Sequence, residues 1–271
     1  MHSNFSARHP DGGHASEPSV LAIIEAFDRP TDMAWETDQA VGSGIFGFNS
    51  IDPRSRSFNL IRGRLLELKR SRGFRLIGVV SATPNVGKSF VAANISASLS
   101  RDPQIRTFLV DLDLRRGSVS EQFGIVPQHG LNDFLQGDHS LETFRLAEQN
   151  LTIIPTRGGM IHSAELLAGA TAQSLLSAMR TSDDANVFIC DLPPVFANDD
   201  AVAVMAHLDS YILVSEEGTT TEREIKDSVE SLGRDKLAGV VLNKFRGGVM
   251  SDGYGVDNYY ARGYGETDLK R

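Results

Sequence analysis

An apolar run leads directly into a glycine- and lysine-bearing loop, and this junction constrains the fold more than any other feature. The run is Leu76–Ser81, and the loop reads ATPNVGKS over residues 82–89. A strand that ends in such a loop and opens a helix at Gly87 aims backbone N–H groups and a helix N-terminus at one point. Lys88 adds a cation for the β- and γ-phosphates, and Ser89 offers a hydroxyl to Mg²⁺. The junction therefore predicts that a nucleoside triphosphate binds here together with Mg²⁺.

The loop departs from the common Gly-x-x-x-x-Gly-Lys-Ser/Thr pattern at its first position, where Ala82 stands. Alanine fits that position if its φ angle is negative. The alternative is a chance loop ahead of a helix, which the strand–loop–helix context disfavours. We expect the nucleotide to contact the loop and the first helical turn, namely Thr83, Pro84, Asn85, Val86, Gly87, Lys88, Ser89 and Phe90.

Apolar runs alternate with helical patterns through most of the chain, which favours an α/β fold. The predicted strands are Leu76–Ser81, Thr107–Leu112, Leu151–Pro155, Val187–Asp191, Tyr211–Ser215 and Ala238–Asn243. The predicted helices are Gly87–Ser100, Ala164–Met179, Asp199–Ala206 and Thr221–Leu232. Strands this apolar are buried on both faces, so the pattern predicts a P-loop NTPase-type, doubly wound, mostly parallel sheet with helices on both faces. Ligands of such sheets lie at the carboxyl ends of the strands.

Residues 1–50 are rich in polar residues and are expected to be a mostly flexible extension. Within it, residues 18–27 favour a short helix, with Ser16 as a candidate cap. The domain proper is expected over residues 51–247, followed by a flexible tail over 248–271. The domain should begin with a basic helix at 57–69, either docked with a solvated basic face or in contact with an acidic partner or the cytoplasmic leaflet.

Composition excludes several classes of protein. No apolar run approaches the roughly 18 residues of a spanning helix, and the polar N-terminus lacks a signal-peptide core, so we expect a cytoplasmic protein with no transmembrane segment of its own. The net charge of −8 gives nucleic-acid binding little support, although residues 51–75 carry eight bases against two acids. Cys190 lies inside an apolar run, which favours a buried, inert thiol over a redox role.

Two more predicted strands end in carboxylates. Asp111 and Asp113 follow Thr107–Val110, and Asp191 follows Val187–Cys190. Strand ends of a parallel sheet meet at the edge that carries the phosphate loop, so Asp191 is expected to hold Mg²⁺ beside Ser89. One of Asp111 and Asp113 would support the metal while the other accepts a proton from an attacking hydroxyl. The alternative is that these carboxylates cap a following helix or pair with Arg115.

The segments SATPNVGKS, FLVDLDLRR and VFICDLPP together resemble the three Walker-type motifs of the bacterial tyrosine kinases of capsule and exopolysaccharide systems. The resemblance extends through GLNDFLQG, LTIIPTRGG, SAELL and GVVLNKF, and covers roughly residues 57–265. It implies an ATP-dependent protein-tyrosine autokinase whose catalytic residues are Lys88, Asp111, Asp113 and Asp191. In that family's pattern Lys88 would hold ATP, Asp111 would activate the tyrosine, and Asp113 and Asp191 would support metal and water. It also implies that Ser89, Asp111 and Asp191 hold Mg²⁺, with Asn243 near the nucleotide base.

The end of the chain carries four of its five tyrosines, which are Tyr254, Tyr259, Tyr260 and Tyr264. They stand among Gly, Ser, Asp and Asn, a composition that does not bury a core. Tyrosines on a flexible tether are suited to enter a neighbouring copy's site, and the resemblance implies phosphorylation of this cluster in trans within a homo-oligomer. The alternative is a merely disordered tail.

The chain also departs from the resembling family. In place of the family's Glu-x-x-Arg-x-x-Arg helix motif, which is tied to ring assembly, this chain has Arg56, Asn59 and Arg62. In place of the family's Gly-Glu pair within the loop, it has Asn85-Val86. The activating membrane domain is absent, so a membrane-embedded polysaccharide co-polymerase on a separate chain is the expected partner. The alternatives are a ParA/MinD-like ATPase, which would carry a second lysine where Thr83 stands, and a catalytically weak nucleotide-binding regulator.

Overall fold

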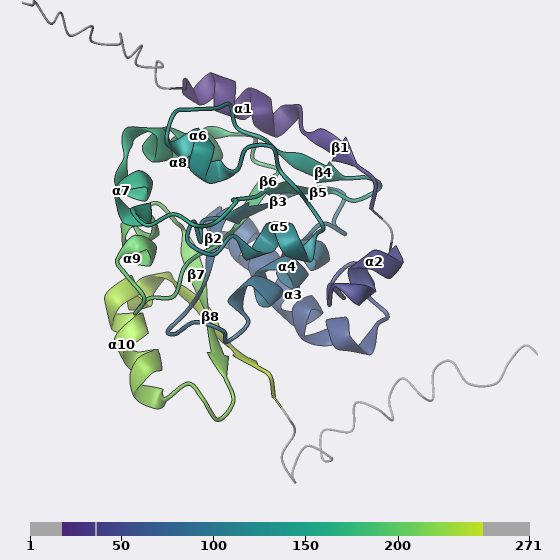
Figure 1. Cartoon of the computed structure of the whole chain (residues 1–271). Helices are drawn as coiled ribbons and strands as arrows, with labels where there is room; N and C mark the ends of the chain where they lie inside the picture. Colours follow the sequence, from purple (N-terminus) through teal and green to yellow (C-terminus); the bar gives the residue numbers. More distant parts are fainter. Residues whose placement is uncertain (1–17, 36, 246–271) are drawn as a thin grey trace, which may run out of the picture.

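A computed structural model of the chain describes residues 18–35 and 37–245, and its centre is one eight-stranded sheet (Figure 1). The strand order is β1-β4-β5-β3-β6-β2-β7-β8, and every neighbouring pair is parallel except β4 with β5. The strands are β1 Thr31–Met33, β2 Leu76–Ser81, β3 Arg106–Asp111, β4 Phe144–Leu146, β5 Leu151–Ile154, β6 Asn186–Asp191, β7 Ser210–Glu216 and β8 Leu237–Asn243. The predicted doubly wound, mostly parallel sheet is confirmed.

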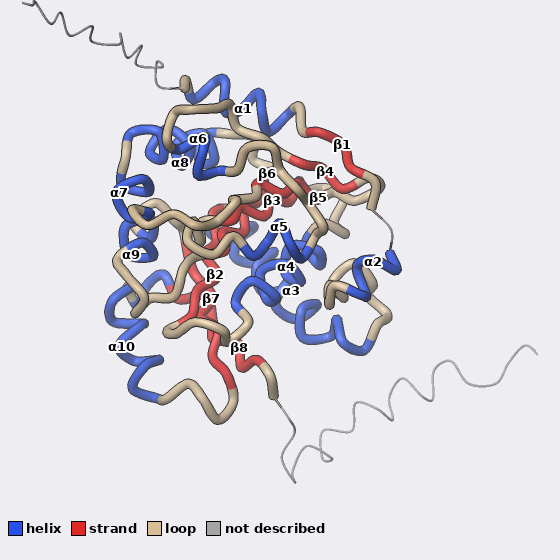
Figure 2. Tube along the Cα trace, in the orientation of Figure 1, coloured by secondary structure: helices blue, strands red, loops and turns tan. Residues whose placement is uncertain are grey.

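Helices cover both faces of this sheet (Figure 2). One face carries α1 Val20–Asp28, α6 Leu131–Leu135, α7 Ser163–Ala168, α8 Ala170–Thr181, α9 Asp200–Met205 and α10 Glu222–Leu232. The other carries α2 Thr37–Gly42, α3 Arg56–Arg72, α4 Lys88–Leu99 and α5 Ser118–Gln122. Two 3₁₀ turns complete the set, η1 Pro53–Ser55 and η2 Arg234–Lys236. No helix in the described part of the chain has the length and apolarity needed to cross a membrane.

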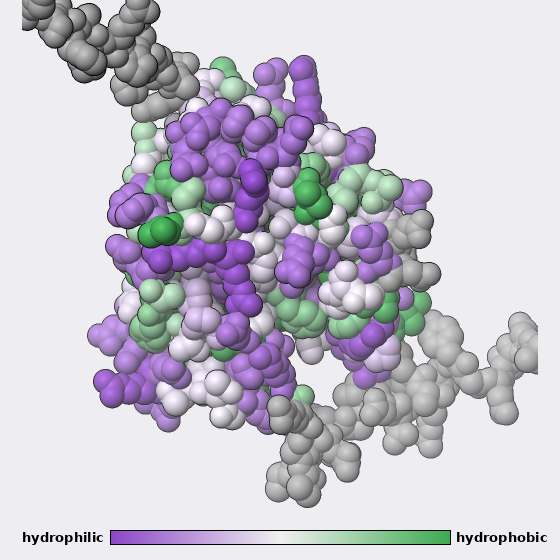
Figure 3. All heavy atoms as spheres, viewed as in Figure 1, coloured by the Kyte–Doolittle hydropathy of each residue, from purple (hydrophilic) through white to green (hydrophobic). Residues whose placement is uncertain are grey.

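The central strands are buried on both sides because alternate residues point to opposite faces. In β3, Phe108 and Val110 join the core under α8 and α1, whereas Leu109 packs toward α4. The aromatic rings of Phe108 and Phe188 stack with centroids 4.7 Å apart across β3 and β6. Two continuous apolar cores therefore cover the two faces of the sheet. The surface that Figure 3 shows is mostly hydrophilic, with scattered apolar side chains.

The segment before residue 50 differs from the expected flexible extension wherever it is described. Helix α1 packs on α8, with Ile23 1 % and Phe27 0 % exposed, and β1 adds a strand to the sheet. The predicted helix at 18–27 is present, but Ser19, not Ser16, caps it by accepting a hydrogen bond from the Ala22 N–H at 3.2 Å. Residues 18–35 and 37–50 thus belong to the packed domain, because α1 offers two large apolar side chains to the core.

The structure has two helices where the sequence predicted one. The expected Ala164–Met179 helix is broken at Gly169, whose extended backbone (φ −71°, ψ 166°) ends α7 and begins α8. Helix α3 contains the predicted basic helix, and Phe58, Leu65 and Leu68 are buried, as a docked helix requires. Strands β1 and β4 were not predicted, since three residues show too little alternation to be recognised. Cys190 is fully buried in β6, as expected for an inert thiol, and burial raises its pKa.

Candidate active site

The phosphate loop lies between β2 and α4, as predicted, and its shape depends on two left-handed residues. Gly87 has φ +91°, and a Cβ at this position would lie 2.2 Å from the Asn243 side-chain nitrogen. Ala82 is not among the residues with positive φ, so alanine fits the place where the common pattern has glycine. Gly87 is required both for its backbone angle and for the close approach of Asn243.

Asn85 forms the outer part of the loop with φ +67°. Asparagine tolerates this left-handed conformation better than other residues with a side chain, which explains how it replaces the glycine of the resembling family. The Asn85 side-chain oxygen accepts a hydrogen bond from Arg116 Nη1 at 2.6 Å. Its main-chain oxygen accepts one from Lys244 Nζ at 2.7 Å. The loop is therefore held from two sides.

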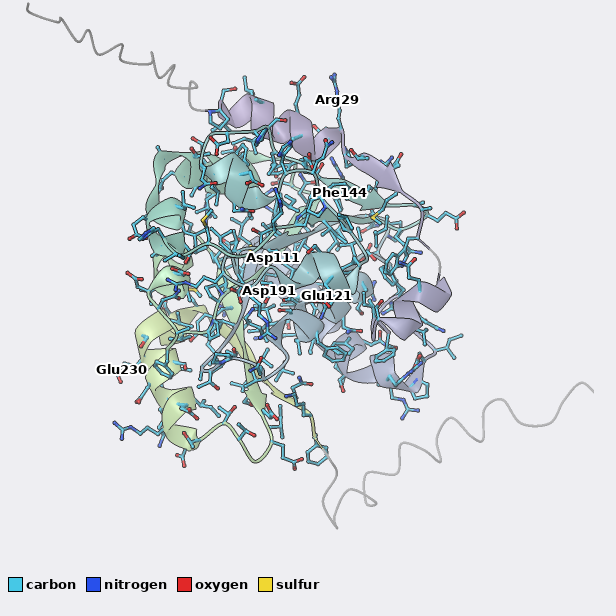
Figure 4. The ribbon with its side chains drawn as sticks, viewed as in Figure 1. Arg29, Asp111, Glu121, Phe144, Asp191 and Glu230 are labelled. Carbon is cyan, nitrogen blue, oxygen red and sulfur yellow. The ribbon has the colours of Figure 1, made fainter. Side chains whose placement is uncertain are left out.

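Lys88 is 7 % exposed and lies between carboxylates from two strand ends. Its Nζ is 2.8 Å from Asp113 Oδ2 and 3.2 Å from Asp191 Oδ1. Asp111 and Asp191 are register partners on β3 and β6, and Figure 4 shows them side by side at the centre of the molecule. The predicted convergence of the lysine and the three carboxylates is thus present in the fold.

Burial sets the charge state of this cluster. It raises the pKa of Asp111 well above the ordinary value, and the neighbouring Asp191 raises it further. Burial also raises the pKa of Asp191, although the Lys88 ammonium opposes the shift. For Lys88, burial acts to lower the pKa, but Asp191 and Asp113 outweigh it and raise the pKa overall. Burial and neighbouring like charges account for the two raised aspartate pKa values, and the opposite charges of the carboxylates account for the raised pKa of Lys88.

Asp111 and Asp113 occupy different positions despite their spacing of two. Asp111 is fully buried and accepts backbone N–H bonds from Val119 at 3.1 Å and from Asp113 at 3.2 Å, so it holds the start of α5 in place. Asp113 instead lines the cavity beside the loop. The helix-capping alternative therefore describes one part of the role of Asp111, and Asp113 is the carboxylate that faces open space.

The cavity beside the loop has a volume of about 350 Å³. Its walls contain the predicted residues Pro84, Asn85, Gly87, Lys88, Ser89, Phe90 and Asp113. They also contain Arg115, Arg116, Ser118, Gln122, Pro193, Pro194, Ala197 and Asn198, which were not predicted as site residues. The two arginines directly follow the Asp-bearing segment of β3, and that adjacency is the sequence signal by which they could have been found.

Five of the predicted catalytic, nucleotide and metal residues line no part of this cavity, and Asp111, described above, is one of them. Thr83 accepts a hydrogen bond from Ser81 Oγ through its carbonyl oxygen, and Val86 is buried under the loop. Asp191 lies behind Lys88, and Asn243 donates from its amide nitrogen to the Val86 carbonyl oxygen at 2.8 Å. Asn243 thus supports the loop, and its expected place near a nucleotide base remains a prediction.

The donor set fits a magnesium–nucleotide complex. The Ser89 hydroxyl accepts a bond from Ser118 Oγ at 2.8 Å and faces the cavity. Asp191 Oδ2 is buried and has no hydrogen-bond partner among the described residues, which leaves one carboxylate oxygen for a ligand. Hydroxyl and carboxylate oxygens are the protein ligands that Mg²⁺ takes when phosphates fill much of its shell.

Two further features predicted from the sequence are the tyrosine cluster and the altered helix motif. The tyrosines Tyr254, Tyr259, Tyr260 and Tyr264 are outside the described residues. The position of the altered helix motif is on α3, where the Asn59 side-chain oxygen accepts a hydrogen bond from Arg101 and Arg62 lies 3.6 Å from Asp102. These contacts tie α3 to the end of α4 and the turn after it within one chain.

Comparisons with known proteins identify the family of the chain. The family model described as the CobQ/CobB/MinD/ParA nucleotide binding domain matches residues 77–254. The succinoglycan biosynthesis transport protein ExoP of Rhizobium meliloti is 34 % identical over 203 residues, which are 71 % of this chain and 25 % of that protein. The tyrosine-protein kinase ptk of Acinetobacter johnsonii is 30 % identical over 199 residues, 73 % of this chain and 26 % of that protein. The chain therefore spans about a quarter of the length of these curated relatives.

Solved structures extend the likeness to the fold. The BceF tyrosine kinase domain is 26 % identical with a TM-score of 0.62 and covers 82 % of this chain and 96 % of its own. The septum site-determining protein MinD of Pyrococcus horikoshii, complexed with Mg-ADP, has a TM-score of 0.54 at 23 % identity, covers 64 % of this chain and 71 % of its own, and shows the fold alone. The resemblance to bacterial tyrosine kinases is confirmed. The chain belongs to the CobQ/CobB/MinD/ParA nucleotide-binding domain family.

Proposed function

We propose that this chain is an ATP-dependent protein-tyrosine autokinase that regulates the polymerisation or export of exopolysaccharide or capsule. The observation that carries the proposal is the buried Lys88, paired with Asp113 at 2.8 Å and Asp191 at 3.2 Å beside the loop cavity. A phosphoryl-transfer site needs a lysine for the phosphates and carboxylates for metal and nucleophile at one point. Relatives named as tyrosine kinases and as a succinoglycan transport protein support the same assignment.

In this proposal the ion pairs of Lys88 are exchanged for phosphate contacts when nucleotide binds. Lys88 turns from its carboxylates to the β- and γ-phosphates, which releases Asp113 toward the cavity. Ser89 and Asp191 would hold Mg²⁺, and Asp111 would support them. When bound, Mg²⁺ would supply positive charge that offsets the negative charge developing on the transferred group.

Asp113 is the proposed general base because it lines the cavity, whereas both oxygens of Asp111 accept backbone N–H groups. The tyrosine oxygen forms a bond to the γ-phosphorus while the bond from that phosphorus to the β–γ bridging oxygen breaks. The hydroxyl proton passes to Asp113, and ADP leaves with the bridging oxygen. The acceptors are Tyr254, Tyr259, Tyr260 and Tyr264 of a neighbouring copy.

The proposal includes a setting for the enzyme. A cytoplasmic protein of this kind would be recruited to the inner face of the plasma membrane by a membrane-embedded polysaccharide co-polymerase on a separate chain. This setting is supported by the similar proteins, which include a succinoglycan biosynthesis transport protein. The basic face of α3, with three basic residues in its last turn, suits such a contact.

The test is to incubate the purified chain with ATP and Mg²⁺ and to map phosphotyrosine by mass spectrometry. Phosphate on the four tail tyrosines, lost in Lys88→Met and in Asp113→Asn, is the expected result. ATP hydrolysis with an unmodified tail would support the ParA/MinD-like ATPase instead, which the family model also includes. Nucleotide binding with neither activity would support a regulator that signals through assembly.

A further inference from the structure

Three cations line the loop cavity among the described residues, and they differ in what they contact. Lys88 pairs with two carboxylates. Arg115 donates from Nε to Ser163 Oγ at 2.9 Å and lies 3.6 Å from the fully buried Asp200, so it offsets a buried charge. Arg116 has no carboxylate within salt-bridge distance in the described part of the chain. Its side-chain partner among the described residues is the neutral amide oxygen of Asn85, 2.6 Å from Nη1.

The backbone beneath Arg116 is fixed. Its N–H donates to the Asp113 carbonyl oxygen at 3.0 Å, so the two residues share one turn. Gly117 follows with φ +66°, and a Cβ at Gly158 would lie 2.6 Å from the Arg116 carbonyl oxygen. The neighbouring glycine segment therefore packs tightly against the turn and leaves the guanidinium as its adjustable part.

We propose that Arg116 is a γ-phosphate ligand that rests on Asn85 until a nucleoside triphosphate binds. This inference rests on the proposed function, in which the cavity takes ATP. A guanidinium bonds a phosphate through charge-assisted, bidentate contacts that are stronger than its single bond to a neutral amide. Triphosphate binding therefore draws Arg116 away from Asn85.

Position on the turn explains why the γ-phosphate is the target. The loop N–H groups and Lys88 approach the phosphates from the β2–α4 side. Arg116 approaches from the β3 side, on the same turn as Asp113, the proposed base that meets the transferred group. A cation at that point stabilises the charge of the transferring phosphoryl group, as arginines do in other phosphoryl-transfer sites. ADP lacks the group that Arg116 recognises.

The experiment measures the affinity of the full chain for Mg·ADP and for the Mg complex of the β,γ-imido analogue of ATP by calorimetry. Arg116→Ala is expected to weaken the analogue about 10- to 100-fold and to change ADP affinity less than about twofold. Arg116→Lys keeps a cation but lacks the planar guanidinium, so its affinity for the analogue should lie between those of the parent chain and Arg116→Ala. The matched control is Arg145→Ala, since Arg145 pairs with Asp32 on β1, away from the cavity.

Asn85→Gly tests the resting contact separately, because glycine accepts the left-handed φ of residue 85 without strain. Because Asn85 is also part of the loop, the readout is the ratio of analogue affinity to ADP affinity, which should be at least that of the parent chain. The inference is overturned if Arg116→Ala weakens both nucleotides equally or neither, or if Asn85→Gly lowers this ratio as much as Arg116→Ala does. These affinities need no phosphotyrosine, so a chain that discriminates through Arg116 but never modifies its tail would refute the kinase and keep the subsite.

Discussion

Lys88→Met should destabilise the nucleotide-free protein as well as inactivate it. The Lys88 ammonium is 7 % exposed and is the positive charge between Asp113 and Asp191, with Asp111 on the adjacent strand end. Removing one partner of a buried ion pair costs about 3–5 kcal/mol, because the remaining charge is left without compensation. For a domain of this size, that loss lowers the melting temperature by roughly 6–20 °C.

The loss of stability should depend on pH, since a carboxylate left without its cation can bind a proton and become neutral. Protonation costs about 1.4 kcal/mol for each pH unit above the ordinary pKa near 3.9, which limits the penalty to about 1.5 kcal/mol at about pH 5. At about pH 8 the same protonation costs more than 5 kcal/mol, so the full loss of about 3–5 kcal/mol in stability is expected. The folded state raises the pKa of Asp111 and of Asp191. Their contribution to folding stability is therefore complete below the unfolded pKa and is lost as pH rises through the folded pKa.

The assay is thermal unfolding of the parent chain and Lys88→Met at several pH values, followed by circular dichroism. Lys226→Met is the matched control, because Lys226 forms an exposed pair with Glu222 that contributes about 0–1 kcal/mol. Adding Asp191→Asn to Lys88→Met removes one of the uncompensated carboxylates and should recover part of the loss. Equal melting temperatures at about pH 8, or a larger loss at low pH than at high pH, would refute the reasoning.

Three further predictions concern the site and the fold. Asp113→Asn should slow tail phosphorylation about 100- to 10,000-fold while nucleotide affinity, measured by calorimetry, changes little, whereas a retained rate would exclude Asp113 as the base. Lys244→Met removes the bonds from Nζ to the Asn85 carbonyl oxygen and to Glu216, and should weaken Mg·ADP about tenfold in the same titration; unchanged affinity would mean that the loop needs no support from β8. Phe27→Ala should lower the free energy of unfolding in urea by about 3–5 kcal/mol, and a loss below about 1 kcal/mol would show that α1 is peripheral.

The buried strands of the sheet could be predicted closely from the sequence. The bounds of β2 were predicted to the residue, and β3, β5, β6, β7 and β8 to within one residue at each end. Continuous apolar runs of this length mark such strands, and those of β3, β6 and β8 end at Asp or Asn. The convergence of Lys88, Asp113 and Asp191 followed from the rule that parallel strands present their carboxyl ends to one edge.

Contacts between polar residues far apart in the chain could not be predicted. Lys244 supports Asn85 across 159 residues, and Arg116 reaches the same residue across 31. Neither contact leaves a periodic signal, because each depends on where a single long side chain points. The sequence also left open whether α1 docks on its own domain or serves as a partner motif, since a polar composition flanks Ile23 and Phe27, the two apolar residues that dock it. The division between Asp111 and Asp113 likewise depends on backbone donors that the spacing alone does not reveal.

Transfer of phosphate between two copies of the chain tests the central claim most directly. One copy keeps its site but carries Phe at Tyr254, Tyr259, Tyr260 and Tyr264, and the other carries Asp113→Asn with its tyrosines intact. The two are mixed with ATP and Mg²⁺, and phosphotyrosine is mapped on each. Phosphate on the tail of the Asp113→Asn copy is the predicted result. Hydrolysis of ATP by the first copy, with no phosphate on the second, would contradict the account.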